Sequence, residues 1–397
     1  MTKYRNLSIF VILFGTLAIS TSMGMNLVIF PVYMEQRGVS TSLIGTVLSA
    51  DMVAAIAVSL IFAMYLSKVN YRFWFVASLL VRIPMLGLMT LTDSIALWAV
   101  FIFFNGIGTN IFTLLLQTWL NSVPIEKYNG LIFALMGTCV SLGYALGPIL
   151  YENVAYFHPA FNFISALLAL DPQLIIDKGV FWVTTMVSVI ASVPLLLIMF
   201  AIPKTSQRGN GNLWGAIKVA QLPMIAVGVN GLVMLGVSSF ITIYGMRNGL
   251  ELFDASLMLT AFMVGGIILE TPISWLSDIV NRYYILIAAI FISILCAVYL
   301  PIIIYNKFQA WTLLFIWGGV VASIYSMCMA LIGEIFTGDD IIIANSAYSL
   351  MDSMGAGLGM LSIGFAMDFF IYDGFSYVIM FACLLFFAYC LTRYKVV

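Results

Sequence analysis

Charged residues are scarce in this sequence, and that scarcity limits what the protein can be. Only 8% of the 397 residues are Asp, Glu, Lys or Arg, whereas a soluble globular protein carries about 25%. Sixteen basic and 17 acidic side chains cannot cover a water-facing surface of this size. The net charge of −1 also leaves no basic surface for nucleic acid. The composition therefore excludes a soluble enzyme and a nucleic-acid-binding protein.

Histidine and paired cysteines, which supply most metal and redox sites, are nearly absent as well. The sequence has one histidine, His158, and no two of its five cysteines have CxxC spacing. It contains neither an HExxH zinc motif nor the G-x-x-x-x-G-K-[ST] nucleotide-binding loop. We therefore expect no metal, no cofactor, no disulfide and no enzymatic activity.

Apolar residues make up 63% of the chain, as expected of a protein built from membrane-spanning helices. A spanning helix needs about 20 such residues, and the sequence contains twelve suitable runs. The predicted fold class is an all-α membrane protein with twelve transmembrane helices in two six-helix bundles. The runs cover approximately residues 7–33, 42–66, 73–92, 95–118, 130–153, 178–202, 219–244, 253–277, 283–304, 309–333, 341–368 and 373–392.

Lysine and arginine are distributed unequally between alternate loops, and this bias predicts the orientation. Eleven of them lie on the side of the N-terminus and four on the other, while Arg82 falls within a run. Both termini are therefore predicted to be cytoplasmic. The inside residues are Lys3, Arg5, Lys68, Arg72, Lys127, Lys204, Arg208, Lys218, Arg282, Arg393 and Lys395; the outside residues are Arg37, Lys178, Arg247 and Lys307.

A polar segment with several glycines, residues 204–218, divides the runs into six and six. The predicted domains are an N-terminal six-helix bundle (1–203), a cytoplasmic linker (204–218) and a C-terminal six-helix bundle (219–397). Residues 152–177 form the longest predicted outer loop. That loop is either an ordered cap on the outer face or a short interfacial helix.

The two halves of the chain resemble each other after a shift of 211 residues without a gap. The matches that chance explains least pair Tyr33 with Tyr244, Gly38 with Gly249, and Asn70 with Asn281. Two parallel six-helix repeats, with a substrate site between them near the bilayer midplane, are a transporter architecture.

Several segments resemble motifs of the major facilitator superfamily. Ala63–Arg72 and Ser274–Arg282 resemble its G-x-L-A-D-R-x-G-R-R motif, although the first copy lacks the acid and both have asparagine for the later glycine. Asn105–Gly108 resembles the R-x-x-Q-G-x-G motif without its arginine, and Gly143–Pro148 resembles the G-x-x-x-G-P motif common in exporters. From about Gly318 onward the pattern is similar to the YcaD-like bacterial branch of this family.

This resemblance implies a monomeric secondary active transporter that moves a small organic solute by rocker-switch alternating access. The G-x-x-x-G-P element weakly favours export. Because no nucleotide loop is present, protons are the predicted coupling ion, with another ion such as sodium as the alternative. An uncoupled facilitator, a channel-like protein or a receptor-like protein is the rival function. The expected partners are the small-molecule substrate, the coupling ion and the lipid bilayer, and the resemblance to a bacterial branch implies the bacterial inner membrane.

Four charged residues lie well inside the predicted helices, away from their ends, where a charge is costly and usually marks a function: Asp51, Arg82, Glu270 and Asp352. Asp51 and Arg82 both lie about 14 Å below the predicted outer boundary, so they are predicted partners. That pair either neutralises itself for packing or contacts substrate. Glu270 has no basic neighbour in sequence, and Asp352 lies among serines and glycines. Both carboxyl groups are therefore candidate proton carriers.

Polar and aromatic residues well inside other runs are candidate cavity-lining residues, although each alone is more commonly a packing or interhelical hydrogen-bonding residue. They are Asn26, Asn105, Asn110, Gln117, Tyr144, Asn230, Trp317 and Tyr325.

Charges at the predicted inner ends of the helices are candidate gating residues. Lys68 is expected to face Asp339 or Asp340 across the two halves, although a helix N-terminus favours acids by itself. In the second half, Asp278, with Arg282 nearby, is expected to cap the start of the fifth helix near residues 129–130.

Overall fold

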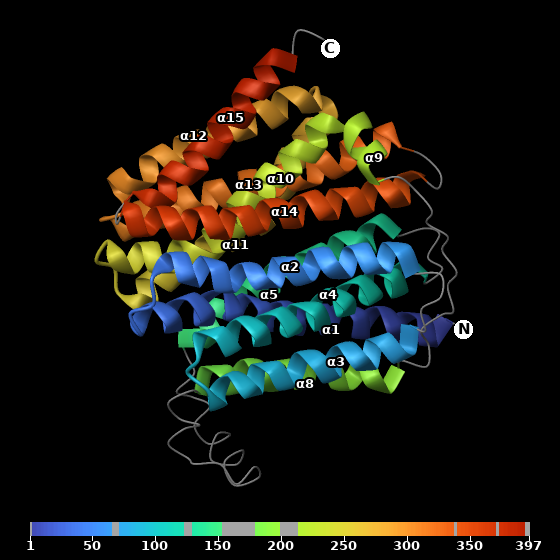
Figure 1. Ribbon diagram of the computed structural model, residues 1–397. Coiled ribbons are helices and arrows are strands. Elements are labelled where there is room, and N and C mark those ends of the chain that lie inside the picture. The colour runs from blue at the N-terminus through green and yellow to red at the C-terminus, as the bar shows by residue number, and fades with distance from the viewer. Residues whose placement is uncertain are drawn as a thin grey trace. The chain divides into compact units, whose positions relative to one another are not determined.

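The computed structural model describes most of the chain, and its regular structure there is helical (Figure 1). The described residues are 2–65, 71–122, 129–152, 179–198, 213–336, 340–370 and 373–393. Their α-helices are α1 (Thr2–Gln36), α2 (Thr41–Tyr65), α3 (Tyr71–Leu88), α4 (Ile95–Ser122), α5 (Asn129–Glu152), α8 (Gly179–Ile198), α9 (Leu213–Val219), α10 (Gln221–Arg247), α11 (Leu252–Ile279), α12 (Arg282–Ile303), α13 (Lys307–Ile335), α14 (Asp340–Phe369) and α15 (Gly374–Arg393).

Each of the twelve apolar runs overlaps one of these helices, so the all-helical class is confirmed. Within the described residues, ten helices are long and apolar enough to cross a membrane. Two shorter apolar helices cover Leu135–Tyr151 and Gly179–Pro194. The chain is therefore an integral, multi-pass membrane protein. The number of twelve crossings and the location of the termini stay predictions.

The short helix α9 is an element that the sequence analysis did not predict. It covers the end of the predicted linker, where the sequence turns apolar again (Leu-Trp-Gly-Ala-Ile-Lys-Val). Ala216 is buried, while Trp214 and Val219 are each 66% exposed. The helix thus has one packed side and one exposed apolar side.

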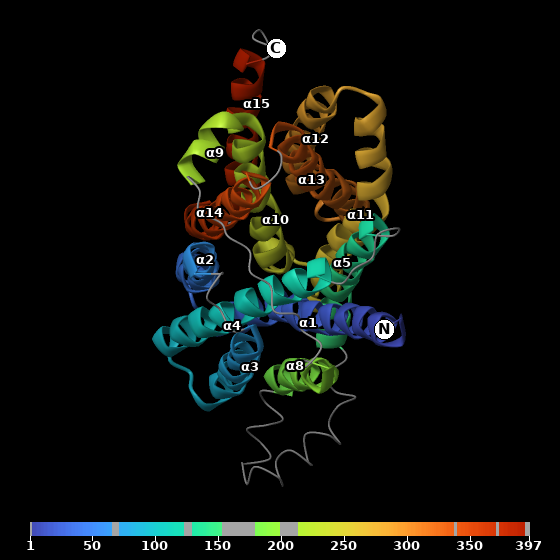
Figure 2. The same cartoon turned by 90° about the vertical axis from the view of Figure 1, so that its right-hand side faces the viewer.

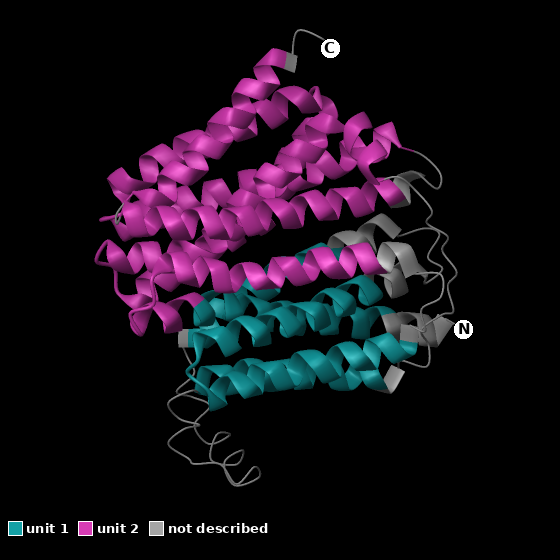
Figure 3. Cartoon of the chain, viewed as in Figure 1, with its two compact units in different colours: residues 1–30, 65–207 teal, residues 31–64, 208–397 magenta. Residues whose placement is uncertain are grey.

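The described helices form two compact units, shown in Figure 3. Unit 1 contains Met1–Phe30 and Tyr65–Gln207, and unit 2 contains Pro31–Met64 and Arg208–Val397. The end of α1 and nearly all of α2 therefore pack with helices from the second half of the sequence. The division of the chain into an N-terminal bundle (1–203) and a C-terminal bundle (219–397) stays a prediction.

The internal repeat is visible in the turns that end α1 and α10. Gly38 and Gly249, which are 211 positions apart, have φ values of 74° and 89°. The Gly38 N–H donates to Glu35 O at 2.9 Å, and the Gly249 N–H donates to Met246 O at 3.0 Å. In both turns the next residue donates to the carbonyl five positions back, which completes the same glycine-dependent helix end. The structure therefore supports the predicted shift of 211.

Glycines bring helices into backbone contact within each unit. In unit 1, a Cβ on Gly24 of α1 would lie 2.7 Å from Tyr144 Cα of α5. In unit 2, a Cβ on Gly318 of α13 would overlap the Phe262 carbonyl oxygen of α11, and α14 meets α10 in the same way at Gly355. Figures 1 and 2 show α14 beside α10 in both views. Backbone contact through small residues is the usual way in which membrane helices pack closely.

Candidate functional site

Unit 2 holds three of the four predicted ionisable residues, namely Asp51, Glu270 and Asp352. Glu270 is half-buried on α11, and its Oε1 accepts a hydrogen bond from the Ser326 hydroxyl of α13. A hydroxyl is a neutral partner, so this contact does not compensate the charge of the carboxylate. Both the ionised and the protonated carboxyl can accept this hydrogen bond.

Asp352 lies on α14, also half-buried, one turn after Tyr348, which packs against Tyr325 of α13. The Tyr348 hydroxyl donates to the Tyr325 carbonyl oxygen of α13 at 2.7 Å, and the two rings pack edge to face at 5.1 Å. Tyr348 is fully buried, whereas Tyr325 is 39% exposed. A Cβ on Gly231 of α10 would lie 2.9 Å from Asp352 Oδ1, so this carboxylate lies against the α10 backbone. Helices α10, α13 and α14 thus surround Asp352 and the two tyrosines.

Two further predicted residues of unit 2 each bury one polar side-chain atom that has no hydrogen-bond partner among the described residues. They are Asn230, through its Oδ1, and Trp317, through its Nε1. Trp317 packs edge-on against Phe262 with ring centres 6.4 Å apart. Its surroundings are those of a packing residue, and its predicted role in lining a cavity stays a prediction.

Unit 1 contains a buried polar network around Arg82, a side chain that is 0% exposed on α3. Its Nη2 donates to Ser22 Oγ of α1 at 3.1 Å. Ser22 Oγ also lies 2.9 Å from Thr184 Oγ1 and 2.8 Å from Ser188 Oγ, both on α8. The Thr184 hydroxyl donates to Asn26 Oδ1 at 3.2 Å. The network therefore joins α1, α3 and α8 through hydroxyl groups, one amide and one guanidinium.

The predicted lining residues of α4 and α5 take different positions within unit 1. Asn105 Nδ2 donates to the Arg82 carbonyl oxygen at 3.3 Å, whereas Asn110 Nδ2 donates to Gly106 O of its own helix at 2.9 Å. The Tyr144 hydroxyl donates to Met23 Sδ at 3.8 Å. The side chain of Gln117 lies outside the described residues.

The predicted partners Asp51 and Arg82 belong to different units. Asp51 is a half-buried residue of α2 in unit 2, and Arg82 belongs to unit 1. The partnership therefore stays a prediction.

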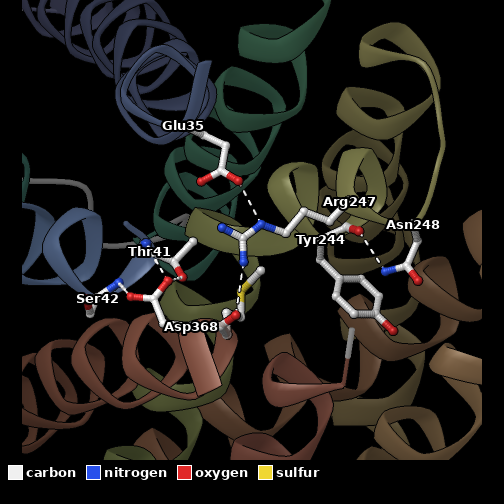
Figure 4. Close-up of polar contacts among 8 residues, drawn as sticks. Glu35, Thr41, Ser42, Tyr244, Arg247, Asn248 and Asp368 are labelled. Atoms are coloured by element: carbon white, nitrogen blue, oxygen red, sulfur yellow. Dashed lines mark hydrogen bonds and ion pairs between the residues drawn. The ribbon is translucent and has the colours of Figure 1, made fainter. Parts of the chain in front are cut away.

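A polar cluster at one end of unit 2, shown in Figure 4, was not among the predicted site residues. Arg247 at the end of α10 forms an ion pair with Glu35 at the end of α1, with Nε 2.7 Å from Oε1. Arg247 Nη1 also donates to the Met367 carbonyl oxygen of α14 at 3.0 Å. The ion pair is part-buried, with side-chain exposures of 21% and 17%.

Asp368 belongs to the same cluster and caps the start of α2. Its Oδ1 accepts from the Thr41 N–H at 2.9 Å and from the Thr41 hydroxyl at 2.5 Å, and its Oδ2 accepts from the Ser42 N–H at 2.8 Å. A carboxylate is favoured here because the first N–H groups of a helix have no partner within the helix. The cap comes from a residue 327 positions away, so the local sequence gives no signal of it.

The structure describes the side chains of only some of the candidate gating residues, which are those predicted to lie at the inner ends of the helices. Asp278 Oδ1 lies 2.6 Å from Arg282 Nη2, and Arg282 Nη1 lies 3.4 Å from Glu334 Oε1, which links α11, α12 and α13. The side chain of Asp340, at the start of α14, is outside the described residues, as are Lys68 and Asp339. Their pairing and the cap near residues 129–130 stay predictions.

No group of three or more His, Cys, Asp or Glu that could hold a metal ion occurs among the described residues. The described polar groups in the interior of the helices include the carboxyls of Glu270 and Asp352, several hydroxyls, the amide of Asn26 and the guanidinium of Arg82. They can bind protons and donate or accept hydrogen bonds.

Comparison with known sequences gives matches over nearly the whole chain. A family model described as Major Facilitator Superfamily matches residues 12–256 and 224–396. The uncharacterized MFS-type transporter YfkF of Bacillus subtilis (strain 168) is 22% identical over 356 residues, covering 88% of this chain and 86% of YfkF. The uncharacterized MFS-type transporter YcaD of Escherichia fergusonii is 21% identical over 357 residues, with the same coverage.

Solved structures resemble this chain over nearly its full length. The inward-facing, unoccupied structure of a bacterial homologue of the human lysosomal transporter Spinster has a TM-score of 0.74 at 12% identity and covers 99% of this chain and 96% of its own. A mutant form of the nucleoside transporter NupG has a TM-score of 0.76 at 12% identity and covers 96% of this chain and 100% of its own. At 12% identity, the similarity to these structures shows the fold alone.

Proposed function

Because the chain belongs to the major facilitator superfamily and is a membrane transporter, not an enzyme, we propose that it moves a small organic solute by proton-coupled alternating access. The observation that carries the coupling is the position of Glu270 and Asp352. Both are carboxyl groups in the interior of apolar helices, and no basic side chain forms an ion pair with either among the described residues. Ionisable groups inside the membrane commonly form proton relays.

The surroundings of the two carboxyls fit proton exchange better than a fixed charge. Glu270 contacts a serine hydroxyl, and Asp352 lies beside backbone and tyrosines. Neither environment supplies a positive charge that would hold the carboxylate ionised, so each group can alternate between its two forms. Both residues are half-buried and so are not sealed in the core of unit 2.

The same groups restrict the substrate class. The interior of unit 2 offers carboxyls, hydroxyls and amides, and the buried network of unit 1 contains a single guanidinium. We infer a neutral or cationic organic solute, because a polyanion would face uncompensated carboxylates. Export is the proposed direction, on the Gly143–Pro148 motif alone. Gly143 and Gly147 also serve α1–α5 packing, since a Cβ on Gly143 would lie 2.5 Å from Ser20 Cβ.

The proposal is tested with purified protein in liposomes that contain a pH-sensitive dye. A thermal-shift screen of neutral and cationic metabolites first identifies a solute that stabilises the protein. Adding that solute to one side should then move protons across the membrane in parent liposomes, and a pH gradient should accumulate the solute. If a sodium gradient drives accumulation of the solute and a pH gradient does not, the coupling ion is sodium and not the proton.

An uncoupled facilitator is the second candidate, because major facilitator proteins can equilibrate a solute without an ion. Counterflow of labelled solute into liposomes preloaded with unlabelled solute separates a carrier from a channel. A carrier gives transient accumulation of label. A channel gives no transient accumulation of label. A carrier whose transport does not respond to a pH gradient or a sodium gradient is an uncoupled facilitator.

A further inference from the structure

The short helix α9 packs on one side against α14 and leaves its other side exposed. Ala216 and Ala220, which are four positions apart, are 6% and 2% exposed. Trp214 and Lys218 are also four positions apart and so share a face, and both are exposed, as is Val219. Figures 1 and 2 show α9 beside α14 in both views. The exposed side of α9 therefore combines a tryptophan, a lysine and a valine.

Backbone hydrogen bonds hold α9 against the end of the spanning helix α10. A single residue, Ala220, separates the two helices, and its φ of −109° and ψ of 49° lie outside the helical region. The Ala220 N–H donates to Ala216 O at 3.1 Å, and the Met224 N–H donates to Ala220 O at 3.1 Å. The chain therefore changes direction at Ala220 without losing these hydrogen bonds. Because α10 is long and apolar enough to span the membrane, α9 lies close to the level where the apolar core meets the headgroups.

The segment that contains α9 carries charge of one sign only. Residues 203–219 include three basic residues, Lys204, Arg208 and Lys218, and no Asp or Glu. Lys218 forms no ion pair with the residues that the structure describes. This end of α10 is predicted to face the cytoplasm, where the membrane leaflet has a negative surface potential. Charge complementarity therefore favours anionic lipid as the partner of the exposed side of α9.

We propose that Trp214, Lys218 and Val219 form a lipid-binding surface that lies in the headgroup layer and binds an anionic phospholipid. Tryptophan suits this layer because its ring is apolar and its N–H is polar. Lys218 can bury its methylene groups at the same depth and extend its ammonium group to a lipid phosphate. Val219 adds apolar area at the boundary between headgroups and acyl chains. A free anion would pair with the ammonium group but leave Trp214 and Val219 in water, so the combination favours a lipid.

A lipid bound to α9 would also stabilise the helices on which α9 rests. Helix α9 packs against α14 and continues through Ala220 into α10. These two helices are in backbone contact at Gly228 and Gly355. A ligand that binds the folded protein and not the unfolded chain raises the stability of the folded protein. Anionic lipid should therefore raise the melting temperature of the parent protein more than that of Lys218→Gln.

The first test measures lipid binding to the purified full chain by native mass spectrometry, with phosphatidylglycerol and phosphatidylcholine as the probes. We expect the parent to bind phosphatidylglycerol more tightly than phosphatidylcholine. Lys218→Gln should weaken the binding of phosphatidylglycerol about fivefold, which is the usual contribution of one basic side chain at an anionic membrane surface, and should leave phosphatidylcholine binding unaltered. Lys307→Gln is the matched control, because Lys307 Nζ already pairs with Asp254 Oδ2 at 3.0 Å, and it should bind both lipids like the parent.

A spin label at Val219, in a chain without native cysteines, gives a second and local readout. In liposomes that contain phosphatidylglycerol, oxygen dissolved in the membrane should reach the label more readily than a water-soluble nickel chelate does. Trp214→Ala should reverse that order, whereas the control Trp275→Ala, which removes a 63% exposed tryptophan of α11, should keep it.

Three results would overturn the lipid-binding surface. The first is equal phosphatidylglycerol binding by the parent and Lys218→Gln together with a label at Val219 that faces water. The second is displacement of the bound lipid by inorganic phosphate, which would assign the site to a free anion. The third is a dimer that Trp214→Ala dissociates, which would assign the surface to a second copy of the chain. Neither measurement uses a solute or a pH gradient, so each result is independent of proton coupling.

Discussion

Replacing Gly318 by alanine tests how closely α11 and α13 pack. The added Cβ would overlap the Phe262 carbonyl oxygen and lie 2.6 Å from its carbonyl carbon, where ordinary contact begins at 3.4 Å. The two backbones must then separate by roughly 1 Å, and overpacking of this kind costs about 1–3 kcal/mol. A rigid helix pair cannot absorb the change by turning a side chain, because the contacting atoms belong to the backbone. Gly318→Ala should therefore lower the free energy of unfolding.

Gly333→Ala is the matched control on the same helix. Nothing lies within 4 Å of its added Cβ, so alanine should stabilise by up to about 1 kcal/mol through its higher helix propensity. The two variants should thus have melting temperatures on opposite sides of the parent value. The assay is thermal unfolding of detergent-solubilised protein followed by circular dichroism. Equal melting temperatures for the two variants would refute the backbone contact between α11 and α13.

The remaining predictions concern the buried network and the orientation. Ser22→Ala should lower the free energy of unfolding by about 1–3 kcal/mol, because each buried polar partner of Ser22 loses a hydrogen bond. The control Thr185→Ala should cost less, because the Thr185 hydroxyl donates to Phe181 O within its own helix at 2.7 Å. A larger loss of thermal stability in Thr185→Ala than in Ser22→Ala would contradict the network. Cysteines introduced at Val280 and Tyr305, at opposite ends of α12, should react with an impermeant reagent from opposite sides of the membrane, with Val280 on the inside. Labelling of both from the same side would contradict the orientation.

The sequence predicted the helices well because membrane helices are specified by long apolar runs. The repeat was also predictable, since Gly38 and Gly249 mark two helix ends that only a residue tolerant of positive φ can form. The positions of Glu270 and Asp352 inside helices followed directly from their apolar neighbours. Their neighbours in space, Ser326 and Tyr348, did not, because a hydroxyl in an apolar run is ordinary composition.

The polar cluster around Asp368 and the hydroxyl groups of the network around Arg82 were not predicted, for a different physical reason. Glu35 and Asp368 lie near the ends of helices, where charged residues are common and usually face water or headgroups. Their significance depends on which helix ends meet, and Thr41 and Asp368 are 327 positions apart. The sequence therefore indicated Arg82 and Asn26, which lie well inside helices, but gave no signal of Ser22 or Asp368.

The most direct test of proton coupling compares Glu270→Gln and Asp352→Asn with Glu334→Gln, an exposed glutamate of α13 that pairs with Arg282. Each variant is reconstituted in liposomes, and pH-gradient-driven accumulation of the identified solute is measured beside uncoupled exchange of the same solute. The account predicts that at least one of Glu270→Gln and Asp352→Asn keeps exchange but loses accumulation, while Glu334→Gln keeps both. Accumulation equal to that of the parent in both interior variants would contradict coupling through these carboxyls.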